Sequence, residues 1–174
     1  MARCAQIPEF IEQECSLESG RIVGLAFIHK DIHAAIYADP SSAVNWADGS
    51  YAQDLYVFQE VRGSYTGGSP TEINGVGSQS TKVINAEHAL TVFLQGVKGN
   101  EDFFNEIVKT DDYRVAFVVG GDYGLLYINN VDTSIYGTAP VEEGLDTEVG
   151  WNITVKWKDI SNPRTSNVPT GIFN

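Results

Sequence analysis

Apolar and polar residues alternate along much of the chain, which is the pattern of β-strands with one buried face. The clearest example is residues 148–158, where Trp151, Ile153, Val155 and Trp157 share one face. Polar residues occupy the intervening positions, so we expect both tryptophans to lie in the core. Alternation also predicts strands over residues 54–65 and 81–97, and nearly continuous apolar runs predict buried strands over residues 21–28, 113–119 and 125–129. The sequence therefore predicts a mainly β protein of about seven or eight strands, folded as a β-sandwich or barrel.

One flanking α-helix is predicted over residues 100–110. Asn100 is a favourable N-cap, and the acidic residues that follow it suit the positive end of the helix dipole. Phe103 and Ile107 are four positions apart, which places both on one apolar face. A helix of about ten residues is marginal in isolation. We therefore expect this helix to pack against a sheet.

The chain is short enough to form one domain. We expect a β domain over residues 21–159, preceded by an N-terminal arm (1–20) and followed by an extended C-terminal arm (160–174) that contains two prolines. Residues 63–80 are rich in glycine, serine and threonine and predict a long loop. This segment is interpreted either as a long hairpin with a flexible tip or as a loop that becomes ordered on assembly.

Charge excludes several kinds of partner. The chain has 11 Lys and Arg against 23 Asp and Glu, a net charge of −12, and each half of the sequence carries −6. Such a protein lacks the basic surface with which proteins grip nucleic acids, and it is equally unsuited to an anionic membrane. No apolar run reaches the length of about 18 residues that a membrane-spanning helix needs. The N-terminus also has no pattern of a secretory signal, so we expect none.

The densest acidic stretch contains Glu142, Glu143, Asp146 and Glu148. It is interpreted as a solvated turn, because runs of charge usually face water. The alternative is a surface that repels a polyanion or meets a basic partner.

Candidate catalytic and metal-binding residues are few. His29, Asp31 and His33 would share a face if they lay on a strand, but no third strong ligand accompanies the two histidines. No G-x-S-x-G motif selects a nucleophilic serine. Residues 75–80 only partly match a dinucleotide-binding loop, and the aspartates at 111, 112 and 122 do not have EF-hand spacing. We therefore predict no catalytic residue, no cofactor, no metal site and no enzymatic activity.

Other residues leave alternatives open. Cys4 and Cys15 are interpreted as reduced thiols, with a disulfide or a zinc site as alternatives. Trp46 and Tyr51 lie in a loop-like stretch with a short helical turn from Ser41, and they suit either sugar binding or a protein interface. A further alternative is a hydrolase whose catalytic residues come from distant parts of the sequence. Such a site would use His29, His33 or His88.

Three stretches of the sequence, and the order in which they follow one another, resemble the tail tube proteins of tailed bacteriophages. They are Gly20–Ile28 after the cysteine-containing arm, Gly99–Phe104 at the start of the helix, and Glu148–Trp157 before the proline-containing end. The chain looks most like small structural proteins from phages or prophages of Bacteroidetes-type bacteria. The resemblance implies a β-sandwich or barrel with one flanking helix and a subunit that assembles into hexameric rings. It also implies that the rings stack through arms and long loops around an acidic channel.

The functional expectation follows from this resemblance. It is a non-enzymatic virion protein, located in the tail or neck and made in the bacterial host. Its rings stack as a tail tube, and DNA passes through without specific binding. Its partners are then other copies of itself and neighbouring virion proteins, with no membrane involved. A neck or connector ring protein of the same particle and a carbohydrate-binding β-sandwich module are the alternatives.

Overall fold

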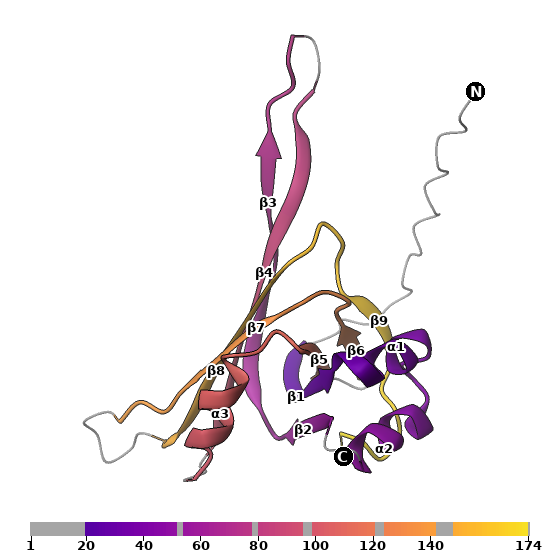
Figure 1. Cartoon of the computed structure of the whole chain (residues 1–174), viewed down its shortest axis with the longest axis vertical. Helices are drawn as coiled ribbons and strands as arrows, with labels where there is room; N and C mark the ends of the chain where they lie inside the picture. The colour runs from indigo at the N-terminus through magenta and orange to yellow at the C-terminus, as the bar shows by residue number, and fades with distance from the viewer. Residues whose placement is uncertain are drawn as a thin grey trace.

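The computed structural model describes residues 20–51, 54–77, 80–95, 99–120, 124–141 and 148–173. The protein is mainly β, with 51% strand and 17% helix, and it contains two antiparallel sheets. This confirms the predicted fold class. Figure 1 shows the two sheets in one body, from which a long hairpin projects.

Nine strands form the two sheets in the described residues. The five-stranded sheet, called sheet A, has the order β2 (Leu55–Gln59), β1 (Arg21–His29), β5 (Tyr113–Gly120), β6 (Leu125–Ile128) and β9 (Arg164–Asn167). The four-stranded sheet, called sheet B, has the order β3 (Arg62–Ile73), β4 (Lys82–Gln95), β8 (Gly150–Lys158) and β7 (Ser134–Thr138).

The main core lies between the two sheets. Trp151, Ile153, Val155 and Trp157 of β8 are all buried there, as their alternation predicts. Sheet A contributes Phe27 and Phe117 to the same core. α3 (Glu101–Ile107) closes one side, where its Phe104 stacks on Trp151 at a ring-centroid distance of 4.4 Å.

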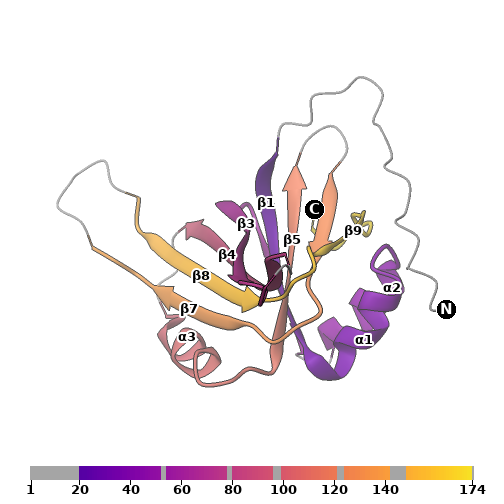
Figure 2. The same ribbon diagram turned by 90° about the horizontal axis from the view of Figure 1, so that it is seen from above.

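Two helices cover the outer face of sheet A, as Figure 2 shows. They are α1 (Lys30–Ala38) and α2 (Ala43–Tyr51). Their Ile36 and Trp46 are fully buried against Ile28 and other residues of sheet A. Because sheet A is covered on both faces, β1 and β5 consist of nearly continuous apolar runs rather than alternating ones.

The prediction of a single helix was incomplete, and several boundaries differ. α3 spans Glu101–Ile107 rather than 100–110, and α1 was not predicted at all. The strand expected over 54–65 is two strands in different sheets. They are separated near Glu60, whose φ of 56° lies in the left-handed region. This turn redirects the chain from sheet A into sheet B.

The predicted loop and C-terminal arm are also corrected. Most of the 63–80 segment belongs to β3, which pairs with β4 through Ile73, so the hairpin interpretation was right and the loop interpretation wrong. Residues 164–167 form β9 at the edge of sheet A, and Phe173 packs on Trp46, so the end of the chain is part of the body. The predicted N-terminal arm, residues 1–20, lies outside the described residues except for Gly20.

Candidate functional site

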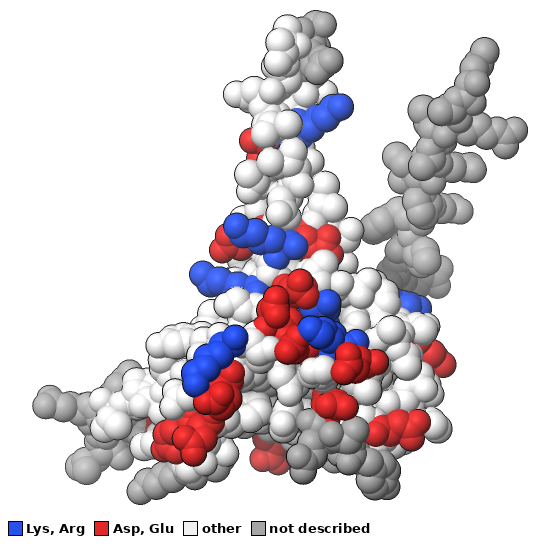
Figure 3. All heavy atoms as spheres, viewed as in Figure 1, with Lys and Arg blue, Asp and Glu red and all other residues white. Residues whose placement is uncertain are grey.

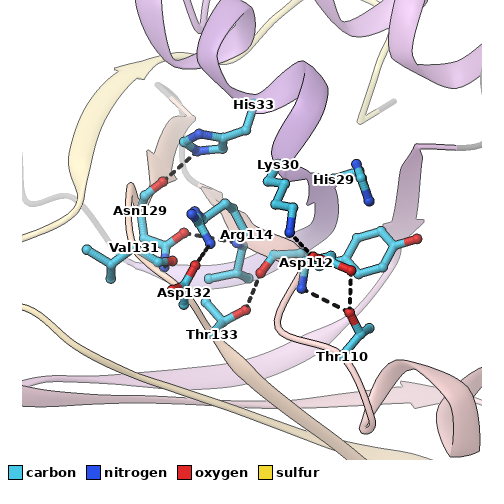
Figure 4. Close-up of polar contacts among 12 residues, drawn as sticks. His29, Lys30, His33, Thr110, Asp112, Arg114, Asn129, Val131, Asp132 and Thr133 are labelled. Atoms are coloured by element: carbon cyan, nitrogen blue, oxygen red, sulfur yellow. Dashed lines mark hydrogen bonds and ion pairs between the residues drawn. The ribbon is translucent and has the colours of Figure 1, made fainter.

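The two histidines proposed as the start of a metal site do not share a face. β1 ends at His29 and α1 begins at the next residue, so the expected strand does not continue to His33. The His29 ring packs edge-on against Tyr113, whereas His33 is buried and its Nε2 lies 2.7 Å from the backbone oxygen of Asn129 (Figure 4). Within the described residues, no group of three or more His, Cys, Asp and Glu side chains is placed to hold a metal ion.

The polar side chains around His33 connect elements that are distant in sequence. The Asn129 side chain accepts a hydrogen bond from the Val115 backbone N–H at 3.0 Å and donates one to the Val131 carbonyl at 3.1 Å. Nearby, Arg114 pairs with Asp132, and Lys30 pairs with Asp112 (Figure 4). Burial lowers the pKa of His33 from its ordinary value of 6.5, so the ring is neutral in the folded protein. This network positions α1 against sheet A.

The three tryptophans are buried, so none of them offers a platform for sugar binding. Trp46 is fully buried, and its indole N–H donates to the Pro40 carbonyl at 2.9 Å. Trp151 and Trp157 lie in the main core. The side chain of Tyr51 lies outside the described residues, as do Cys4, Cys15 and Asp122. Asp112 is engaged by Lys30 and by the Thr110 hydroxyl.

The projecting hairpin is the most distinctive surface feature. β4 pairs with β8 only from Glu87 to Gln95, so the outer ends of β3 and β4, residues 69–73 and 82–86, form a two-stranded ribbon that no third strand joins in the described part of the chain. We call this ribbon the distal hairpin. It projects well beyond the body in Figure 1. Ile73, Val83 and Ile84 are exposed by 51%, 42% and 52%.

The base of the hairpin is held rigidly. The rings of Tyr65, His88 and Trp157 are nearly parallel, with centroids 5.3 to 6.0 Å apart. His88 Nε2 lies 2.9 Å from the Asp159 carbonyl, which only accepts, so this nitrogen carries the hydrogen. His88 Nδ1 therefore accepts the hydrogen bond of the Tyr65 hydroxyl at 2.7 Å. Burial also raises the pKa of Tyr65 and keeps its hydroxyl protonated.

Gly68 lets the two strands approach closely at this base. A Cβ atom at Gly68 would lie 2.7 Å from the Ala86 Cβ and 2.9 Å from the His88 ring. The pairing register of β3 with β4 shifts between Thr66 and Ser69, beside this glycine. The direction in which the hairpin leaves the body therefore depends on Gly68 having no side chain.

Charge is distributed unevenly over the fold. The strands of sheet B contain four of the 11 basic residues and only two of the 23 acidic ones, a net charge of +2. The remaining sequence carries seven bases and 21 acids, a net charge of −14. Figure 3 shows that most of the charged side chains on the visible face lie on the body, while the projecting hairpin is mostly uncharged. This difference becomes visible only when the strands are assigned to their sheets.

Comparison with known protein families, curated proteins and solved structures gives no match. Of the helices in the described ranges, none is both long and apolar enough to cross a membrane.

Proposed function

We propose that this protein is a non-enzymatic structural subunit that assembles with copies of itself into rings, as the tail tube protein of a tailed bacteriophage. The observation that carries the proposal is the distal hairpin. A two-stranded ribbon is at best marginally stable in water, and exposed β-branched side chains on it favour contact with another protein. A protein that acts alone gains nothing from such an extension.

The edges of sheet B support assembly of identical subunits. In the described residues, β3 and β7 are its two outer strands, and each presents one edge without a neighbouring strand. Free edges are templates for pairing with another chain. Contact between the β3 edge of one copy and the β7 edge of the next is head-to-tail. Such contacts form a closed ring when the rotations from copy to copy add up to a full turn.

The test is negative-stain electron microscopy combined with size-exclusion chromatography and light scattering over a wide concentration range. We expect rings or tubes, and a protein that stays monomeric at every concentration contradicts the proposal. The double variant Val83→Lys and Ile84→Lys adds charge to the distal hairpin and should abolish assembly without unfolding the body. Val44→Lys is the matched control, because Val44 is 68% exposed on α2, away from the hairpin.

A neck or connector ring protein of the same particle is the second candidate, and the same free edges of sheet B favour it. The two functions differ in stacking: a tube protein forms stacked rings, whereas a connector forms single rings. Micrographs of the purified protein distinguish them directly.

A further inference from the structure

An open pocket lies between α3, β2 and β5, and no residue of sheet B is among those that line it. Its volume is about 370 Å³. Three aromatic side chains form its wall, namely Tyr56 of β2, Phe103 of α3 and Tyr113 at the start of β5. Asp102 and Glu106 of α3 also line it.

The three rings form one connected group. The Tyr56 ring lies 4.9 Å from the Phe103 ring and 5.9 Å from the Tyr113 ring, measured between centroids, at interplanar angles of 67° and 52°. All three side chains are half-buried, so each contacts the core and keeps part of its surface toward the pocket. Rings from three separate elements therefore enclose a single volume.

The surroundings of the pocket are negative. Burial, first, and then the neighbouring Tyr56 and the carboxylates of Asp54 and Asp112 raise the pKa of Tyr113 to about 12. Two lysines are already paired with these carboxylates, since Lys109 bonds to Glu106 at 2.6 Å and Lys30 pairs with Asp112. Neither lysine lines the pocket.

We propose that this pocket binds one organic cation, the ammonium or guanidinium group of a basic side chain from a second copy of this chain. The negative faces of aromatic rings attract such cations, and nearby carboxylates add to the attraction. A metal ion fits poorly, because the described residues bring no three ligating side chains together here.

Charge complementarity points to a second copy as the source of the cation. The strands of sheet B carry a net charge of +2, whereas the rest of the sequence carries −14. Basic residues of sheet B in one copy could therefore pair with acidic residues of a second copy. Lys156 is 57% exposed, and its nearest carboxylate, that of Glu87, lies 4.0 Å away. Lys158 is exposed on the same face. The choice of a second copy rests on the proposed self-assembly, whereas the cation site itself does not.

The site is tested on the dilute full-length protein by titration with N-acetyl-arginine amide, followed through the NMR signals of the tyrosine rings. Potassium chloride at the same ionic strength is the control. We expect saturable shifts of Tyr56 and Tyr113 with the arginine probe in the millimolar range, about tenfold weaker in Asp102→Asn/Glu106→Gln and absent in Phe103→Leu. Glu101→Gln, an exposed acid on the same helix outside the pocket, should bind as the wild type does.

Two results would overturn the proposed cation site: equal NMR shifts with potassium chloride, or unchanged binding of the arginine probe in Phe103→Leu. A normal circular dichroism spectrum of each variant shows that it is folded.

Whether the cation comes from a second copy is tested separately by sedimentation velocity. Lys156→Gln/Lys158→Gln and Asp102→Asn/Glu106→Gln should each weaken self-association several-fold. Probe binding with unchanged self-association in both would overturn the assignment to a second copy, while absence of any self-association would count against the proposed function.

Discussion

The buried side chain of Asn129 provides the sharpest test of the hydrogen bonds that join β5 to the segment after β6. It is only 3% exposed, and it satisfies the backbone N–H of Val115 and the backbone carbonyl of Val131. Asn129→Ala removes both hydrogen bonds and leaves these two backbone groups without their partner. A buried polar group left without a hydrogen bond costs about 1–3 kcal/mol, so the expected loss for two is about 2–6 kcal/mol of unfolding free energy.

Urea denaturation monitored by tryptophan fluorescence measures this loss. With a slope of about 2 kcal/mol per molar urea, the midpoint should fall by about 1–3 M while the slope stays constant. The adjacent Asn130 is exposed, so Asn130→Ala is a matched control with an expected change within about 0.5 kcal/mol. Equal stabilities of the two variants would refute the structural role of the Asn129 hydrogen bonds.

Three further predictions concern stability. Trp46→Ala should destabilise the protein by about 3–5 kcal/mol, because Trp46 is fully buried; a change below 1 kcal/mol by the same urea assay would contradict its place in the core. Gly68→Ala should cost about 1–3 kcal/mol and Gly67→Ala almost nothing, since a Cβ at Gly67 meets no atom within 4 Å; thermal unfolding compares the two. The lowered pKa of His33 means that the unfolded state binds more protons, so stability should fall as the pH drops through about 6.5. His33→Phe should flatten this part of the profile between pH 7 and 5, and an unchanged slope would exclude His33 as its source.

Strand identity was predictable where one face of a strand meets the core. The apolar positions of 148–158 became the buried face of β8, because a strand places alternate side chains on opposite faces. β1 and β5 were equally recognisable as buried strands. Their continuous apolar runs, however, gave no indication that two helices cover the outer face of sheet A.

Local patterns failed where distant contacts decide the structure. The glycine-rich stretch that became β3 lacks the alternation of a buried strand, because most of it has solvent on both sides. It is a strand because β4 supplies its hydrogen bonds. β9 was missed for a related reason, since it pairs with β6, which is distant in the sequence.

The sequence by itself determined the mainly β composition, the buried faces of the long strands, the helix after residue 100 and the total charge of −12. Only the tertiary structure decided which strands share a sheet. That assignment separates the net charge of +2 in sheet B from −14 in the rest of the chain, and it brings Tyr56, Phe103 and Tyr113 together around one pocket. The physical reason is that charges and aromatic rings interact with groups that are close in space. Residues that are distant in a sequence of 174 residues become close only when the chain folds.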